Sequence, residues 1–270
     1  MFWKKKTAED YVAKKEYKKA VSLYRERLAD QPENTALIIN IADTLMADKE
    51  AEEALKEYKK VADIYTDQGF IVKAIAIYKK MLKIRPDMQE IEHLLANLSE
   101  RVANHESPTS IQPQNTAPSK PEVTKTLEIE NKLLKDLTTE EFKQIVKKLN
   151  LRYFDEDTIV VKEGDPGDSL FIIVRGQVRV LTKDANQREV LLANLGEGEF
   201  FGEIALITGK PRTATIITNT TSELLELTRK DYDAVVAKHP HVKQVVEDFH
   251  LKRAYKTIEA LIQSLQEKQS

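Results

Sequence analysis

The chain of 270 residues contains no cysteine and only eight glycines. Without cysteine it can form no disulfide, no thiolate-ligated zinc site, no iron–sulfur cluster and no cysteine nucleophile. No apolar run reaches the roughly 18 residues of a membrane-spanning helix. The basic start, residues 1–6, is not followed by the apolar stretch of a secretory signal. These absences predict a soluble, cytoplasmic protein without a membrane span.

An excess of charge of one sign is also missing. The chain has 42 Lys and Arg against 44 Asp and Glu, which gives a formal net charge of −2. No segment carries the positive field that nonspecific nucleic-acid binding needs. The sequence has no Ser/His/Asp motif, no Walker loop and no His-x-x-x-His pair. His239 and His241 flank Pro240, and we interpret them as a surface pair rather than a metal site. We expect no enzyme, no catalytic residue, no metal and no cofactor.

Glycine and proline are distributed unevenly. Seven of the eight glycines lie between Gly164 and Gly209, and four of the nine prolines lie between Pro108 and Pro121. A first hundred residues with a single glycine indicates helices, and a glycine-dense middle indicates turns between strands. The intervening polar stretch buries too little apolar surface to fold alone. We predict a helical domain over 1–103, a Pro-rich flexible linker over 104–126 and a second domain over 127–270.

A 34-residue period runs through the helical domain. Ala20 and Ala54 are 34 residues apart, and so are Tyr24 and Tyr58. Small and aromatic residues recur at these spacings in three sets, which are Ala20/Tyr24/Pro32, Ala54/Tyr58/Thr66 and Ala74/Tyr78/Pro86. The 20-residue gap between Ala54 and Ala74 predicts that one helix, 51–66, is shared by two hairpins.

This pattern resembles the tetratricopeptide repeat (TPR) family over residues 3–102, with 88–102 as a capping helix. Ala51 and Thr66 depart from the family pattern, where an aromatic residue and a proline are usual. The resemblance implies an all-α solenoid of helical hairpins. It also implies a concave face that binds a protein client.

The second domain begins with helical periodicity over 131–150, in which Thr138 and Glu141 have the spacing of a capping box. Short β-branched runs follow at 158–161, 170–174, 177–182, 190–193, 213–218 and 224–227. Turn residues bound each run, which predicts an antiparallel β jelly roll or barrel with flanking helices. Helices return from Asp231, break near Pro240 and continue to about residue 265.

Two stretches of the second domain carry a resemblance. Gly164-Asp-Pro-Gly-Asp-Ser-Leu-Phe precedes a strand pair, and Phe201-Gly-Glu-Ile-Ala-Leu-Ile-Thr-Gly-Lys-Pro-Arg-Thr-Ala-Thr215 follows it. Together they resemble the cyclic-nucleotide-binding domain family over residues 131–265. The second stretch is similar to that family's phosphate-binding cassette.

The chemistry of these residue types fits a cyclic nucleotide. A buried phosphodiester needs a cation with several donors, which Arg212 supplies. Gly202 lets the backbone approach closely, and a short helix over 202–208 directs backbone N–H groups at the anion. Glu203 can accept the ribose 2′-hydroxyl proton and is expected to pair with Arg212.

The resemblance implies a full set of binding residues, with phosphate contacts from the backbone amides of Ala205 and Thr213. The expected cyclic-nucleotide-binding residues are Phe201, Gly202, Glu203, Ile204, Ala205, Arg212, Thr213 and Ala214. The last helix usually covers the base, and its candidate lid residues are Phe249, Arg253 and Tyr255. The hydroxyl of Thr213 leaves the base open, and cyclic AMP is favoured over cyclic GMP.

Only 58 residues follow Arg212, too few for a helix-turn-helix module after the barrel, so direct DNA binding is not expected. Two functions remain. The first is a receptor-adaptor, in which a cyclic-nucleotide sensor is coupled to a client of the repeats, with a homodimer through the C-terminal helix as a possible assembly. The second is a constitutive TPR scaffold whose barrel is a ligand-free interaction module.

Overall fold

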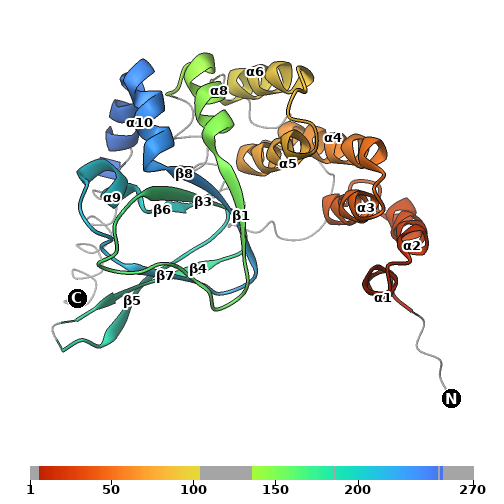
Figure 1. The fold of residues 1–270 in the computed structure, drawn as a ribbon, viewed down its shortest axis with the longest axis horizontal. Helices are drawn as coiled ribbons and strands as arrows, with labels where there is room; N and C mark the ends of the chain where they lie inside the picture. Colours follow the sequence, from red (N-terminus) through yellow and green to blue (C-terminus); the bar gives the residue numbers. More distant parts are fainter. Residues whose placement is uncertain (1–5, 104–135, 185, 249, 252–270) are drawn as a thin grey trace, which may run out of the picture. The chain divides into compact units, whose positions relative to one another are not determined.

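A computed structural model describes residues 6–103, 136–184, 186–248 and 250–251. The chain divides into two compact units, Met1–Ile91 and Glu92–Ser270. Figure 1 shows the elements of both units, and each unit is described below by itself.

The first unit is a layer of helices, each packed on the next along the chain. Its described helices are α1 (Ala8–Ala13), α2 (Tyr17–Asp30), α3 (Thr35–Ala47), α4 (Ala51–Asp67) and α5 (Ile71–Ile84). α4 is a single helix that contacts both α3 and α5, so the predicted sharing of one helix by two hairpins is confirmed. Side-chain caps begin two of these helices, at Thr7 and Asn34.

The repeated small and aromatic residues form the core of this unit. Ala20, Ala54 and Ala74 are fully buried, which lets neighbouring helices approach closely. Tyr24 and Tyr58 are buried as well and direct their hydroxyls to acidic residues of the preceding helix. The hydroxyl of Tyr24 donates to Glu9 at 3.2 Å, and that of Tyr58 donates to Asp43. Aromatic bodies therefore fill the layer while their polar ends stay satisfied.

The predicted capping helix exists as α6 (Glu90–Ala103), but it groups with the second unit. The hydroxyl of Ser99 donates to that of Thr139 at 3.3 Å, and Lys147 pairs with Glu92 at 2.6 Å. The first compact unit ends at Ile91 and the second begins at Glu92, whereas the boundary predicted from the sequence lies after residue 103. The linker predicted over 104–126 lies outside the described residues and stays a prediction.

The second unit is an antiparallel sandwich with helices beside it. Its elements after α6 are α8 (Thr139–Lys148), β1 (Asn150–Phe154), β2 (Ile159–Val161), β3 (Ser169–Arg175), β4 (Val178–Lys183), β5 (Glu189–Leu195), β6 (Phe200–Phe201), α9 (Glu203–Thr208), β7 (Thr215–Thr218), β8 (Ser222–Thr228) and α10 (Arg229–Lys238). Residues 241–248 and 250–251 are also helical, and we call them the C-terminal helical segment. The capping box of Thr138 and Glu141 is confirmed at the start of α8.

The strands form two four-stranded sheets, in the orders β1-β8-β3-β6 and β2-β7-β4-β5. The predicted jelly roll with flanking helices is therefore confirmed, but the described strands do not close into a barrel. Apolar side chains of both sheets meet in one core, whose buried members are Phe171, Ile173, Val178, Leu195, Phe201, Ile216 and Leu224. Phe171 and Phe201 stack with ring centroids 5.2 Å apart.

The sequence missed two strands. β6 has only two residues, too few for any alternation of side chains to be visible. β1 follows α8 directly and continues its apolar pattern, so the periodicity placed its first residue at the end of a helix. The pairing of Asn150 with Glu226 on β8 shows that a tertiary partner decides the conformation there.

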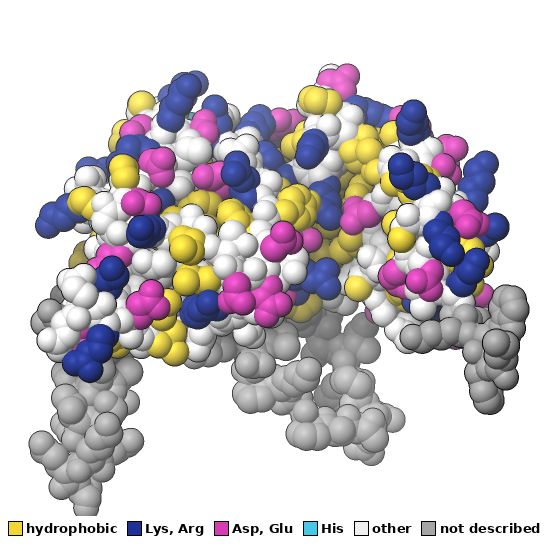
Figure 2. All heavy atoms as spheres, turned by 60° about the horizontal axis from the view of Figure 1, so that its bottom comes forward, with side chains coloured by type: hydrophobic (Ala, Val, Ile, Leu, Met, Phe, Trp, Pro, Cys, Tyr) yellow, Lys and Arg dark blue, Asp and Glu magenta, His cyan; other side chains and the backbone are white. Residues whose placement is uncertain are grey.

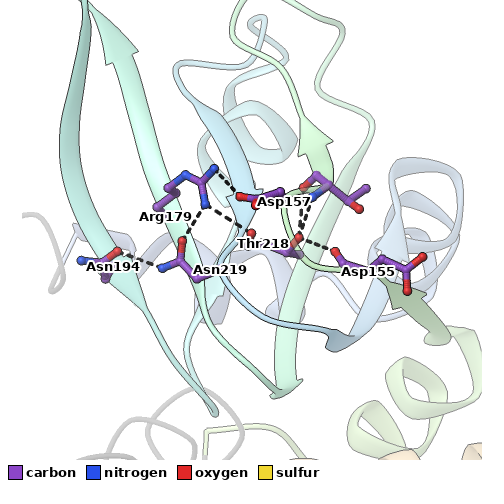
Figure 3. A network of polar contacts seen from close by, with 7 residues as sticks. Asp155, Asp157, Arg179, Asn194, Thr218 and Asn219 are labelled. Atoms are coloured by element: carbon purple, nitrogen blue, oxygen red, sulfur yellow. Dashed lines mark hydrogen bonds and ion pairs between the residues drawn. The ribbon is translucent and has the colours of Figure 1, made fainter.

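A polar network ties the turn between β1 and β2 to the second sheet (Figure 3). Arg179 donates to Asp157 at 2.8 Å and to the side chain of Asn219 at 2.9 Å. The hydroxyl of Thr218 donates to the carbonyl of Asp155 at 2.6 Å. Asn219 in turn donates to Asn194 at 3.2 Å. These contacts lie at the end of β7 away from Arg212 and fix the strand that follows Arg212.

Basic and acidic side chains are interspersed on the molecular face shown in Figure 2, without a broad area of one sign. This agrees with the balanced charge of the sequence. Among the described residues, no helix combines the length and the apolar character that crossing a membrane requires.

Candidate functional site

The segment between β6 and β7 forms the candidate site, because it brings Gly202, Glu203 and Arg212 together. Gly202 precedes α9 and has φ +87°, a conformation that disfavours side chains. A Cβ at this position would lie 2.6 Å from Nη1 of Arg212 and 2.8 Å from the carbonyl oxygen of Ser169. Glycine is thus required both by the backbone conformation and by the close approach of the arginine.

Arg212 is buried, with 5% of its surface exposed. Its Nη1 donates to the carbonyls of Ser169 at 2.6 Å and Gly202 at 3.2 Å, and its Nη2 donates to the Ser169 hydroxyl at 2.9 Å. The guanidinium therefore links the start of β3 to the start of α9.

The carboxylate beside Arg212 belongs to Asp168, not to Glu203. Asp168 Oδ1 lies 3.6 Å from Nη2 of Arg212, and its side chain is 80% exposed. Burial lowers the pKa of Arg212, and the charge of Asp168 opposes that shift. The expected Glu203–Arg212 pair is thus wrong. The loop before β3 lies alongside Arg212. The position of this loop in the sequence does not indicate that contact.

Glu203 is buried at the first position of α9. Its Oε1 lies 3.5 Å from Nδ1 of His250, in the C-terminal helical segment. The carboxylate thus contacts a chain segment 47 residues away in the sequence, as counted from 203 to 250.

Arg229, the first residue of α10, joins three parts of the site. Its guanidinium donates to the carbonyls of Ala205 at 2.6 Å, Leu206 at 2.9 Å and Gly167 at 2.7 Å. Its backbone N–H donates to the carbonyl of Asp168 at 2.6 Å. A cation at the last carbonyls of α9 also suits the helix dipole. Arg229 therefore holds α9, the loop before β3 and α10 together.

The other predicted residues lie in the same segment, with different exposures. Phe201 and Ala205 are buried, Ile204 and Ala214 are half-buried, and Thr213 is exposed. A Cβ on Gly167 would clash with that of Ala205, so the loop packs directly on α9. The candidate lid residues Phe249, Arg253 and Tyr255 lie outside the residues whose side chains the structure describes.

The sequence did not predict that four residues belong to the site, namely Asp168, Ser169, Arg229 and His250. Asp168 and Ser169 belong to the first of the two stretches that carried the resemblance, but no role was assigned to them. Nothing near Arg229 or His250 in the sequence points to the cassette. Only the fold brings them to it.

Comparisons with known proteins identify two kinds of domain in the chain. Residues 151–239 match the family model described as cyclic nucleotide-binding domain. Residues 11–70 match the model of the tetratricopeptide repeat. The chain carries a cyclic nucleotide-binding domain and tetratricopeptide repeats. Both predicted resemblances are confirmed.

The relatives share the cyclic nucleotide-binding domain. A cyclic nucleotide-gated potassium channel of Mesorhizobium japonicum is 34% identical over 110 residues, which cover 41% of this chain and 29% of the channel. The cAMP-activated global transcriptional regulator CRP of Haemophilus influenzae is 31% identical over 94 residues, or 34% of this chain and 42% of the regulator. This chain thus spans less than half the length of either relative.

Among solved structures, a cyclic nucleotide-binding domain from Methylobacillus flagellatus is 26% identical to this chain. The superposition covers 54% of this chain and 83% of that one, with a TM-score of 0.46.

Proposed function

We propose that the second unit binds a cyclic mononucleotide and that the chain is a receptor-adaptor. In this proposal the tetratricopeptide repeats bind a protein client. Binding of the cyclic nucleotide changes the interaction with that client. The chain acts in the cytoplasm, without catalytic activity or direct contact with DNA.

The observation that carries the proposal is the hydrogen bonding of Arg212. A guanidinium has five N–H donors. Three of them are donated within the described residues, to Ser169 twice and to Gly202, which leaves two. A buried cation that is held in place and keeps two donors suits a phosphodiester, which accepts two bonds from the planar guanidinium. Asp168 balances the charge of the arginine at 3.6 Å.

The position of Glu203 supports the same ligand. It begins the helix that follows Gly202, whose carbonyl accepts from Arg212, so a carboxylate and a guanidinium lie at one short segment. A cyclic nucleotide presents an anion and a 2′-hydroxyl on the same fused ring. We assign the phosphate to Arg212 and the hydroxyl to Glu203.

Thr213 is the residue of the segment that bears on the choice of base. Thr213 follows the arginine and is exposed, so its hydroxyl can reach a ligand or water. We propose cyclic AMP as the preferred ligand over cyclic GMP, and the relative from Haemophilus influenzae is described as activated by cAMP.

Calorimetry on the full chain tests the proposal, with cyclic AMP, cyclic GMP and linear AMP as ligands. Binding of a cyclic nucleotide and rejection of linear AMP would support a sensor. A constitutive scaffold predicts no heat with any of the three and no shift in melting temperature. That outcome would refute the proposed function.

Arg212→Ala should abolish binding while the sandwich stays folded. The lost charge-assisted bonds to a desolvated anion cost on the order of 2–5 kcal/mol. Arg188→Ala is the matched control, because Arg188 is 74% exposed and its side chain pairs with Asp184, four residues away. An Arg212→Ala variant that binds within about threefold of the parent, or roughly 0.7 kcal/mol, would contradict the phosphate assignment.

A further inference from the structure

The C-terminal helical segment is tied to the second unit by two histidines. His241 Nδ1 lies 3.2 Å from Oε2 of Glu141 on α8, and His250 Nδ1 lies 3.5 Å from Oε1 of Glu203 on α9. Between them, Val242 and Val245 are buried. The segment is thus packed along its length, with an imidazole–carboxylate contact near each end of its described part.

The His250 contact differs from the His241 contact in burial. The side chain of His250 is 28% exposed, against 53% for His241. His250 Nδ1 is inaccessible to solvent and has no hydrogen-bond partner among the described residues. A buried ring nitrogen without a hydrogen-bond partner is costly, and the contact with Glu203 at 3.5 Å compensates part of that cost.

Other charged and titratable groups lie on α8, on α10 and on the segment itself. On α8 the carboxylate of Glu141 accepts from His241 and from the backbone of Thr138. On α10 the guanidinium of Arg229 is bound to carbonyls, and burial raises the pKa of Tyr232 to about 12, so that phenol stays neutral. On the segment itself, Glu247 pairs with Lys243 at 3.7 Å, and Asp248 precedes His250 by two residues.

We propose that His250 is a latch that competes with the ligand for Glu203. The inference rests on the proposed function, in which Glu203 accepts the ribose 2′-hydroxyl. His250 holds the same carboxylate and fastens the C-terminal helical segment to α9. The ligand must displace this contact to bind, so the contact lowers the affinity of the chain for the ligand.

The test measures the affinity of the full chain for cyclic AMP. His250→Gln should bind more tightly than the parent, by about tenfold if latching is strongly favoured in the parent. His93→Gln is the matched control, because His93 is exposed on α6, and it should behave as the parent does.

A second measurement separates the latch from the proposed function. Without ligand, the amides of residues 242–248 should exchange faster in His250→Gln than in the parent or in His93→Gln. If no protein binds a cyclic nucleotide but this difference in exchange is present, the proposed function is wrong and the latch stands. If His250→Gln binds more weakly than the parent, His250 supports the ligand and the latch is wrong. Equal affinity and equal exchange would also overturn it.

Discussion

The two units of this chain are stabilised by contacts of different range. In the helical unit the ion pairs join residues three or four apart, such as Lys56 with Glu53, or residues of helices that pack together, such as Arg27 with Glu9. In the sandwich the polar contacts join distant segments, such as Arg212 with Ser169, 43 residues apart, and Thr218 with Asp155, 63 residues apart. A repeat is therefore readable from spacing along the chain, whereas a site in a sandwich exists only once the sheets have formed.

The largest effect is expected from the removal of an aromatic side chain of the helical layer. Tyr78 is 1% exposed on α5, so Tyr78→Ala should cost about 3–5 kcal/mol and unfold the helices at a lower temperature. Tyr153→Ala is the control, because Tyr153 is 57% exposed on β1. Calorimetric scans should show the helical transition shifted and the sandwich transition unchanged. A common shift of both transitions would show that the two units unfold together.

The next largest effect is expected from the loss of a long-range contact of the sandwich. Arg229→Met keeps the apolar stem but removes the donors to the carbonyls of Gly167, Ala205 and Leu206. We expect the sandwich to lose about 1–3 kcal/mol, because those carbonyls lose charged partners. Urea unfolding followed by circular dichroism measures the loss. The exposed Arg188 serves as control, and an equal loss in Arg188→Met would rule out a special role for Arg229.

Acid should weaken the sandwich through two carboxylates. Burial raises the pKa of Glu141, but hydrogen bonds from Thr138 and His241 outweigh it, so the pKa lies below its ordinary value. A hydrogen bond from Thr228, together with Lys148, lowers the pKa of Asp231. A lowered folded-state pKa gives stability above the unfolded-state value of about 4, and that stability is lost as the pH falls through the folded-state value.

The acid prediction is tested by urea midpoints of the sandwich transition between about pH 2 and pH 6. Asp231→Asn should reduce the loss of stability in acid, because one of the two carboxylates is removed. Asp30→Asn, at the exposed end of α2, should leave the pH profile unchanged. A profile that Asp231→Asn does not alter would contradict the assignment to Asp231.

The smallest effect concerns a local pair of the helical unit. Lys56 pairs with Glu53 three residues earlier, and both side chains are about half exposed or more. Lys56→Ala should leave the urea midpoint of the helical unit nearly unchanged, because solvent screens the pair. A clear fall of that midpoint would show that local charge pairs matter in this unit.

The two units also differ in how much of each could be predicted from the sequence. The spacing of Ala20, Tyr24, Ala54 and Tyr58 was sufficient for the helical layer, because each helix packs on the next helix along the chain. In the sandwich the motif placed Gly202, Glu203 and Arg212 in one segment. It did not reveal that Asp168 would be the neighbour of the arginine, or His250 that of the glutamate. Their contacts depend on which loops and helices the folded sheets bring together.

The sharing of α4 by two hairpins has a consequence for the direction of the chain. Short connections make neighbouring helices antiparallel, so each helix reverses the direction of its predecessor. The described helices of the first unit up to α5 are odd in number, because α4 serves twice. The chain therefore leaves α5 on the opposite edge of the layer from the one at which it begins α1. Duplication of a 34-residue repeat would add two helices, so the chain would still leave the layer on that edge. Loss of one helix would move the exit of the chain to the other edge. The parity of the helices, more than their number, fixes the edge from which the polypeptide leaves this layer.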